Sequence, residues 1–337
     1  MNIYDISNKA GVSIATVSRV LNGSGKVSES TRQKILAIIE ETGYTPNAFA
    51  RGLGLDTMNT IGILCADSSD PFLAAAIFHL EQGLRSHGYD SLLCCTGYDH
   101  NNKVKCLNLL RSKRVDAVVL LGSNFVEAEA ARNQYILNAA ADIPVVIVNG
   151  FLDGKNVFCS LSDDYDAVKM AAGRCLANGC KTPIYLYRSL SYSGRRKLKG
   201  FEDACLEAGF ESSQIRTFCI NGSVHDTKDF LAQIWCEQHF DAVLTSDDEM
   251  AIGALKFAKE RKISIPSQLS VIGYNNSILG LCCEPELTTV DNQLAFNCTN
   301  AVTLLIKALN GESAPSKTML SAKIVARGTT GAGFFGD

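Results

Sequence analysis

An arginine, two apolar residues and four hydroxyl or amide side chains lie within ten residues near the N-terminus: Ser13, Ile14, Ala15, Thr16, Ser18, Arg19 and Asn22. The guanidinium of Arg19 can donate two hydrogen bonds to O6 and N7 of a guanine, and Ile14 and Ala15 offer apolar surface that suits the methyl group of a thymine. Ser13, Thr16 and Asn22 are suited to phosphate oxygens, and we expect Ser18 to be exposed beside Arg19. On one exposed surface, these side chains would make sequence-specific contacts to DNA.

Two short helices joined by a glycine turn would present these side chains together. Ile6 and Ala10 fall on one face of the first helix, Gly11 and Val12 form the turn, and Ser13 can cap the second helix. The apolar residues of the second helix recur at helical spacing, at Val17, Val20 and Leu21. The pattern predicts a helix-turn-helix, whose second helix lies in the major groove. The alternative is a small helical hairpin with a solvated arginine, but the exposed Ile14-Ala15 pair has no packing role there.

A third helix and a local excess of positive charge complete this unit. Ser28 can cap a helix that Gly43 ends, with Ile35, Ile38, Ile39 and Thr42 along one face. The whole chain has a formal net charge of -3, but residues 1–34 hold five cations against two carboxylates, a net of 5 − 2 = +3: Lys9, Arg19, Lys26, Arg32 and Lys34 against Asp5 and Glu29. The basic patch coincides with the predicted DNA surface. We therefore expect an all-α headpiece over residues 1–44.

Residues 45–58 are predicted to form a hinge between the headpiece and the rest of the chain. The segment contains Gly52 and Gly54 and is too short to form a stable helix alone, so its helicity would depend on an external contact. Without the preceding helices, an ordinary linker would be the preferred interpretation.

The motifs of the first 53 residues resemble the DNA-binding headpiece of the lactose-repressor (LacI/GalR) family of bacterial transcription regulators. The matching residues are Tyr4-Asp5-Ile6, Ala10-Gly11-Val12-Ser13, Ala15-Thr16-Val17-Ser18-Arg19-Val20-Leu21-Asn22, Val27-Ser28, Thr31-Arg32, Gly43-Tyr44-Thr45-Pro46-Asn47 and Ala50-Arg51-Gly52-Leu53. The resemblance continues through nearly the whole chain. It implies that Asn47 and Ala50 join the DNA-binding residues, and that the hinge becomes helical on the operator and inserts Leu53 into the minor groove.

After residue 59, short apolar runs alternate with amphipathic helices, which is typical of parallel sheets covered on both faces. We expect an α/β body of two doubly wound parallel-sheet lobes, similar to periplasmic binding proteins. Lobe 1 is predicted over about 59–160 and 290–320, and lobe 2 over about 161–289 and 321–331, with crossings near 160, 290 and 320. Helices are expected at 200–208 and 250–258 of lobe 2, among others. Such lobes bind small molecules between the carboxyl ends of their strands.

Polar and aromatic side chains at those strand ends are the effector-binding candidates: Ser69, Asp70, Phe72, Asp163, Lys197, Asp247 and Asn275. Asp70 can equally be the N-cap of a helix. The family usually has arginine at position 197 and aspartate at position 275, and together these hold sugar hydroxyls. Lys197 and Asn275 weaken the sugar assignment, because lysine is a point charge and asparagine is neutral. Arg195, Arg196 and Lys197 would suit a phosphorylated ligand or the phosphoprotein corepressor of one branch of the family, although a solvated turn explains both arginines.

Other chemistry has little support in the sequence. The 13 cysteines include no CxxC pair, so they are expected to be structural thiols of a cytoplasmic protein without metal or cofactor. No apolar run reaches the roughly 20 residues of a membrane span. No catalytic constellation can be placed, and His100 and His225 are expected to be solvated. The leading interpretation is a homodimeric transcription regulator, most simply a repressor, that binds operator DNA and a sugar or sugar phosphate. A solute-binding receptor for transport is the alternative from another class.

Overall fold

The computed structural model describes residues 2–21, 27–44 and 57–335. The N-terminal unit has three helices, α1 (Ile3–Ala10), α2 (Ile14–Leu21) and α3 (Glu29–Thr42). Their buried core consists of Ile6, Ala10, Val17, Val20 and Ile35. Ile38 and Ile39 pack against this core from α3, so the predicted helix faces are confirmed.

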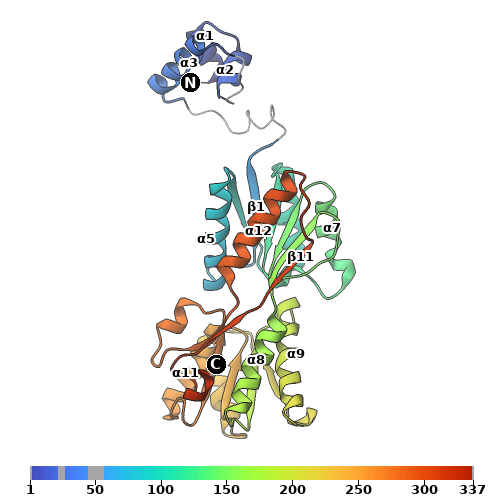
Figure 1. Cartoon of the computed structure of the whole chain (residues 1–337), viewed down its shortest axis with the longest axis vertical. Coiled ribbons are helices and arrows are strands. Elements are labelled where there is room, and N and C mark those ends of the chain that lie inside the picture. Colours follow the sequence, from blue (N-terminus) through green and yellow to red (C-terminus); the bar gives the residue numbers. More distant parts are fainter. Residues whose placement is uncertain (1, 22–26, 45–56, 336–337) are drawn as a thin grey trace.

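The body contains two sheets of six strands each (Figure 1). The first has the order β11 (Lys317–Leu320), β5 (Val157–Ser162), β4 (Val145–Val148), β3 (Ala117–Leu121), β1 (Thr60–Cys65) and β2 (Asp90–Cys95). The second has the order β12 (Lys323–Val325), β10 (Thr288–Asp291), β9 (Ser270–Tyr274), β8 (Ala242–Thr245), β6 (Pro183–Tyr187) and β7 (Arg216–Cys219). The two orders correspond strand for strand, as in an internal repeat.

Helices cover both faces of each sheet, as the alternation of the sequence predicts. In lobe 1, α5 (Pro71–Ser86) and α12 (Leu294–Leu309) pack on one face, and α6 (His100–Ser112) and α7 (Gln134–Ala140) pack on the other. In lobe 2, α8 (Asp164–Ala177) and α9 (Tyr192–Glu207) cover one face, and α10 (Val224–Trp235) and α11 (Asp248–Arg261) cover the other. The described residues also contain five 3-10 turns: η1 (Ser123–Phe125), η2 (Ala130–Asn133), η3 (Ser212–Gln214), η4 (Ile278–Leu281) and η5 (Ala332–Phe335).

The chain passes between the lobes three times. β5 ends the first run through sheet 1 and leads into α8, β10 of sheet 2 leads into α12 on sheet 1, and β11 of sheet 1 leads into β12 of sheet 2. β12 is antiparallel to β10, whereas every other strand pair is parallel. The reason is the short connection after Leu320: the chain leaves sheet 1 at a carboxyl edge and enters sheet 2 at its carboxyl edge, with no crossover helix to reverse it.

The sequence patterns missed four strands of the body, missed the helices α7 and α10, and misplaced the start of one further helix. The strands β5, β7, β10 and β11 are short and contain polar residues, so they do not read as apolar runs. The predicted helix at 200–208 begins eight residues earlier than expected, at Tyr192, where Ser191 caps it through the amide of Gly194. The basic segment that was expected to be a turn is therefore the first half of α9.

Substitution of two glycines, one in α8 and one in α9, would test how closely these helices pack. A Cβ at Gly200 of α9 would lie 2.3 Å from the carbonyl oxygen of Tyr165 in α8, whereas a Cβ at Gly173 of α8 would meet nothing within 4 Å. We expect Gly200→Ala to lower the free energy of unfolding by about 1–3 kcal/mol through overpacking. The control Gly173→Ala should raise it by up to about 1 kcal/mol, because alanine is the better helix former.

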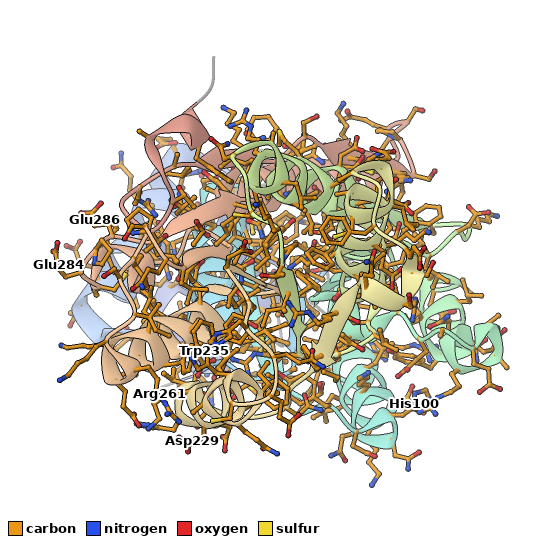
Figure 2. All side chains as sticks on the ribbon, turned by 90° about the horizontal axis from the view of Figure 1, so that it is seen from below. His100, Asp229, Trp235, Arg261, Glu284 and Glu286 are labelled. Carbon is orange, nitrogen blue, oxygen red and sulfur yellow. The ribbon has the colours of Figure 1, made fainter. Side chains whose placement is uncertain are left out.

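The fluorescence of Trp235 can follow this unfolding. It is the only tryptophan of the chain and is labelled in Figure 2. Its ring packs edge-on against Phe240 and Phe257 in lobe 2. Equal denaturation midpoints for the two glycine variants would contradict the close packing.

Candidate functional site

The headpiece holds its second helix by caps and turns that the sequence predicts. Gly11 ends α1 in the left-handed region with φ 67°, and its amide donates to Asn8 and Ser7 carbonyls. Ser13 caps α2: the amide of Thr16 donates to Ser13 Oγ at 3.2 Å. Ser28 caps α3 through the amide of Thr31, and Gly43 ends that helix with φ 60°. These contacts fix the angle at which α2 is presented.

The predicted DNA-binding face of α2 is open to solvent. Ser13, Ala15 and Arg19 are exposed, and Ile14 keeps 37% of its surface exposed although it is a large aliphatic residue. Thr16 and Ser18 are partly exposed, whereas Val17 and Val20 are turned into the core. Because apolar residues of a small domain are normally covered, the exposure of Ile14 is consistent with a contact surface. Asn22, Asn47, Ala50 and Leu53, as well as residues 45–56 of the predicted hinge, lie outside the described residues.

A cleft of about 840 Å³ lies between the two lobes, at the carboxyl ends of their strands. Lobe 1 contributes the segments that follow β1, β2, β3 and β4, with Asp70, Phe72, Tyr98, Ser123, Asn124 and Asn149. Lobe 2 contributes the segments that follow β6 and β7 and the first turn of α9, with Arg188, Ser189, Leu190, Ser191, Arg195, Asn221 and Gly222. The lobes touch here, because Ser123 Oγ donates to Ser191 Oγ at 2.9 Å. A bound ligand would therefore contact both lobes.

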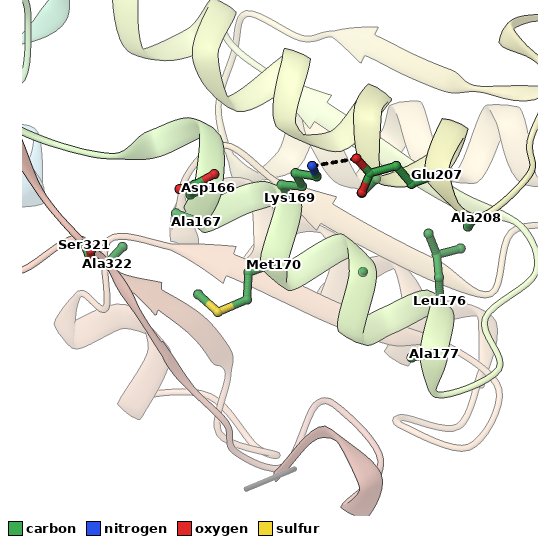
Figure 3. A pocket seen from close by; sticks show the side chains of 12 residues that line it. Asp166, Ala167, Lys169, Met170, Leu176, Ala177, Glu207, Ala208, Ser321 and Ala322 are labelled. Carbon is green, nitrogen blue, oxygen red and sulfur yellow. Dashed lines mark hydrogen bonds and ion pairs between the residues drawn. The ribbon is translucent and has the colours of Figure 1, made fainter.

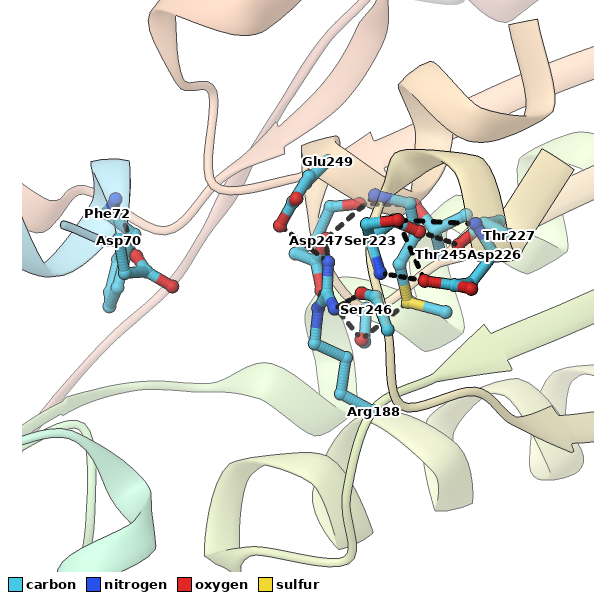
Figure 4. A network of polar contacts seen from close by, with 12 residues as sticks. Asp70, Phe72, Arg188, Ser223, Asp226, Thr227, Thr245, Ser246, Asp247 and Glu249 are labelled. Carbon is cyan, nitrogen blue, oxygen red and sulfur yellow. Dashed lines mark hydrogen bonds and ion pairs between the residues drawn. The ribbon is translucent and has the colours of Figure 1, made fainter. Parts of the chain in front are cut away.

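Arg188 is a charged residue of lobe 2 that lines this cleft, and the sequence analysis missed it. Its Nε donates to Asp247 Oδ2 at 2.7 Å, its Nη2 donates to Glu249 Oε2 at 2.7 Å, and its Nη1 donates to the Gly222 carbonyl (Figure 4). Burial lowers the pKa of Arg188, but the paired carboxylates outweigh this effect and hold the pKa above its ordinary value. Burial also raises the pKa of Glu249, with a smaller contribution from Asp70 of the opposite lobe. Arg188 is thus a fixed cation among carboxylates.

A second polar group occupies the lobe 1 side of the cleft. Lys103 Nζ donates to Glu127 Oε1 at 3.0 Å and to the Asn124 carbonyl. His100 lies beside this pair, with Nδ1 at 3.5 Å from Glu127 Oε1 and its ring edge-on to Tyr135. The prediction that His100 is solvated is therefore wrong, because it opens α6 and its ring packs against α7; His225 is exposed as expected. Arg132 and Arg195 add two further cations to the lining.

Asn124 has an unused hydrogen-bond donor in this cleft. Its Nδ2 is buried and has no hydrogen-bond partner among the described residues. A buried donor without a partner is energetically unfavourable, by about 1–3 kcal/mol. A ligand with an acceptor oxygen would satisfy it.

Lys197 is not placed to bind a ligand in this cleft. It is only 7% exposed, its Nζ donates to the Ser246 carbonyl at 2.9 Å, and the ammonium lies 3.5 Å from the centre of the Tyr274 ring. The hydroxyl of Tyr274 donates to the buried carboxylate of Asp164. Burial lowers the pKa of Lys197 and raises that of Asp164, while each charge counteracts the shift of the other. The residue that was predicted to bind the effector therefore belongs to the core of lobe 2.

The predicted cluster of three cations does not exist as one surface. Arg195 lines the cleft, Arg196 pairs with Asp163 Oδ1 at 3.0 Å, and Lys197 is buried. Consecutive residues of an α-helix point in different directions, which explains the dispersal once α9 is seen to begin at Tyr192.

The remaining effector candidates divide between the cleft and structural roles. Asp70 and Phe72 line the cleft. Asp70 also caps α5, because the amide of Phe72 donates to Asp70 Oδ1 at 2.8 Å, so its predicted capping role is confirmed and its contact with an effector stays a prediction. Asp163 caps α8 and Asp247 caps α11, in addition to their ion pairs with arginine. Ser69 and Asn275 were also predicted to contact the effector, but neither lines the cleft. Ser69 Oγ donates a hydrogen bond to Asp67, and Asn275 borders a smaller hollow beside Phe72 and Phe296.

A further hollow of about 870 Å³ lies on α8 and α9, with Ser321 and Ala322 at its border (Figure 3). Lys169 and Glu207 form an ion pair across it at 2.6 Å. None of the predicted effector residues lines it. Over residues 2–21, 27–44 and 57–335, no helix is both long and apolar enough to cross a lipid bilayer.

Comparison with known proteins identifies the family. Residues 2–47 match the bacterial regulatory proteins of the lacI family, and residues 172–330 match the periplasmic binding protein-like domain. An HTH-type transcriptional regulator of Lachnoclostridium phytofermentans is 50% identical over 332 residues, which are 98% of this chain and 99% of that protein. The chain belongs to the LacI family. It is therefore a transcriptional regulator with a DNA-binding domain, and its relatives are not enzymes.

Other relatives agree with this assignment. Catabolite control protein A of Priestia megaterium is 29% identical over 323 residues, which are 94% of this chain and 95% of that protein. The crystal structure of the lac repressor dimer bound to operator and the anti-inducer ONPF has a TM-score of 0.88 over 98% of this LacI-family chain and 99% of that chain, at 22% identity. This likeness confirms the predicted fold of two lobes and a helical headpiece. The relatives give no support to a transport receptor.

Proposed function

We propose that this LacI-family regulator is a cytoplasmic repressor that binds a pseudo-palindromic operator as a homodimer and is controlled by a sugar or phosphorylated sugar between its lobes. The proposal includes the division into a headpiece over residues 1–44, a hinge over 45–58 and a body over 59–337, with lobes bounded near 160, 290 and 320. The observation that carries it is the presence, in one chain, of an exposed recognition surface on α2 and a polar cleft lined by both lobes.

The lining of the cleft supports a ligand that is rich in oxygen. Amide and hydroxyl groups from both lobes reach it, including Asn124, Asn149 and Ser191, and the unpartnered Nδ2 of Asn124 requires an acceptor. Arg132 and Arg195 are suited to a phosphate or carboxylate group. The carboxylate of Asp70, which also lines the cleft, is suited to hydroxyl donors. A phosphorylated sugar would match both parts of the cleft.

A phosphoprotein corepressor is less well supported than a small molecule. That alternative rested on Arg195, Arg196 and Lys197 acting as one cluster, and these side chains point to three different environments.

The effector part of the proposal is tested through Asn124. A thermal-shift screen of sugars and sugar phosphates would first identify a ligand, which should then change the affinity for operator DNA. We expect Asn124→Ala to weaken binding of that ligand by about 1–3 kcal/mol, through loss of one hydrogen bond, and to leave operator binding without ligand unchanged. The control is Asn138→Ala, an exposed asparagine on α7 of the same lobe. Equal ligand affinities for both variants would place the ligand elsewhere.

The dimer part of the proposal concerns both DNA and protein. One recognition helix reads only a few base pairs, so useful specificity requires two copies related by a dyad. Phe78 of α5 and Ile278 and Leu281 of η4 are exposed apolar residues that a second subunit can cover. We expect footprinting to show two half-sites, spaced by about one helical turn or a multiple of it. Occupation of a single asymmetric half-site by a monomer would contradict this prediction.

A further inference from the structure

Two cysteines face each other at the carboxyl edge of sheet 1. β1 and β2 are parallel, and their register places Cys65 opposite Cys95. Their sulfur atoms lie 3.7 Å apart. Neighbouring strands are about 4.8 Å apart, which falls within the Cα separation of about 4.4–6.8 Å that disulfides span. The two thiols therefore already have the backbone spacing of a disulfide.

The backbones of β1 and β2 are paired up to Cys65 and Cys95, and hydrogen bonds continue beyond them. Beyond Cys65, the amide of Thr96 donates to the Cys65 carbonyl at 2.8 Å, and the amide of Gly97 donates to the Ala66 carbonyl at 2.9 Å. The strands thus remain paired past the two cysteines. Bringing the sulfurs to the bond length of about 2.05 Å requires rotation of the side chains and little movement of the backbone.

The two thiols differ in exposure and in acidity. Cys65 is fully buried in the core of lobe 1, whereas Cys95 lies on the edge strand and is exposed. A hydrogen bond from Ser68, reinforced by one from Cys65, lowers the pKa of Cys95 in spite of partial burial. Burial, together with the hydrogen bond to Cys95, raises the pKa of Cys65 to about 12. An accessible thiol of lowered pKa beside a second thiol is the usual arrangement of an oxidation-sensitive pair.

The corresponding position of lobe 2 lacks this arrangement. There the edge strand β7 ends at Cys219, which is also exposed, but the register of β6 and β7 places Tyr187 opposite it. Cys94, next to Cys95, packs against the other core cluster of lobe 1, on the opposite face of the sheet. Cys219 and Cys94 therefore serve as internal comparisons.

We propose that Cys65 and Cys95 form a peroxide-reactive site that closes reversibly to a disulfide. The Cys95 thiolate attacks one oxygen of hydrogen peroxide, so that an S–O bond forms, the O–O bond breaks and the departing hydroxide leaves as water with the thiol proton. Cys95 is then a sulfenic acid. The sulfur of Cys65 attacks that of Cys95, the S–O bond breaks, and the hydroxyl group leaves as water with the proton of Cys65. Two thiols are oxidised and one peroxide yields two waters.

The site adjoins the cleft. β1 continues into the segment that carries Asp70, and β2 continues into the segment that carries Tyr98, and both side chains line the cleft. The bond would tie the starts of these two segments together.

The test uses the full-length protein, oxidised with hydrogen peroxide, alkylated and digested with trypsin. Cleavage at lysine and arginine places Cys65 in residues 52–85, but Cys94 and Cys95 together in residues 86–103. The Cys94→Ser background removes this ambiguity. We expect a cross-linked peptide pair in that background, its complete loss on adding Cys95→Ser, and its reversal by dithiothreitol. Cys219→Ser should leave the cross-link unchanged.

A second measurement separates the two steps. In Cys65→Ala the second sulfur is missing, so the sulfenic acid should persist on Cys95 and be labelled by dimedone, while Cys219 remains unlabelled in the same digest. Absence of the cross-link, dimedone labelling of Cys219 in place of Cys95, or a disulfide that joins Cys95 of two subunits on a non-reducing gel would each overturn the proposal.

Discussion

We expect Arg19→Ala to weaken operator binding by about 1–3 kcal/mol and to relax discrimination at one base pair of each half-site. Arg19 is exposed on α2, one turn beyond Ala15, and it is the side chain of this helix that can make two parallel hydrogen bonds to a guanine. The measurement is a selection of binding sequences from random DNA by the wild type and the variant, followed by titration of the best sequence and of a non-specific duplex.

The matched control for Arg19 is Lys9→Ala. Lys9 lies in the last turn of α1 and its ammonium is 3.9 Å from Glu41, with both side chains largely exposed. A surface cation of this kind acts on DNA through the phosphates, so its removal should weaken all sequences alike and lower the salt dependence of binding. If Arg19→Ala also weakened specific and random DNA equally, Arg19 would be a phosphate contact and the base reading would lie elsewhere on α2.

Local signals explain why the headpiece could be predicted closely. Its boundaries depend on short-range chemistry: Ser13 and Ser28 cap helices, Gly11 and Gly43 end them, and apolar residues recur at helical spacing. Each of these contacts joins residues within a few positions of each other. No knowledge of the rest of the fold is needed to infer them.

The strands that the sequence analysis missed depend on distant contacts. β5 includes Ser160 and Ser162, which are buried. Their burial is favourable because Ser160 Oγ donates to the Asn297 carbonyl of α12 and Ser162 Oγ donates to the Asn292 carbonyl. β10 includes Thr288, whose hydroxyl interacts with Thr330 at 2.8 Å. The hydrogen-bond partners of these polar residues lie about 40 to 140 positions away in the sequence. The local sequence therefore does not predict a buried strand. Tertiary structure decides these elements.

The position of the cleft could be predicted from the sequence, but the sequence analysis overlooked one of its charged residues and wrongly assigned another residue to it. The carboxyl ends of the strands were the right place, and Asp70 and Phe72 are there. Arg188 follows β6 directly, so the same rule would have selected it. Lys197 was selected by resemblance to an arginine position, and only the packing of α9 against β9 shows that its ammonium is turned onto Tyr274.

We expect Lys197→Ala to lower the stability of lobe 2 by about 3–5 kcal/mol, because it leaves the carboxylate of Asp164 buried without the charge that counteracts its desolvation. The neighbouring Arg196→Ala is the control: that arginine is 39% exposed and its ion pair with Asp163 should contribute about 0–1 kcal/mol. Denaturant titration followed by Trp235 fluorescence gives both values in the same lobe. The double variant Lys197→Met/Asp164→Asn should recover most of the loss, since no charge remains buried and the amide oxygen can still accept from Tyr274.

The pH dependence of Lys197→Ala gives an independent check. Burial already raises the pKa of Asp164 above its ordinary value of 3.8, and Lys197 is the largest of the groups that oppose this rise. Without Lys197 the folded-state pKa should rise further, so the folded protein binds a proton that the unfolded chain has released. Stability relative to the wild type should then be highest below about pH 4 and should fall as the pH rises toward the new folded-state pKa. If Lys197→Ala instead kept its stability at every pH and lost ligand binding, the lysine would be an effector contact and its buried position would not describe the ligand-bound protein.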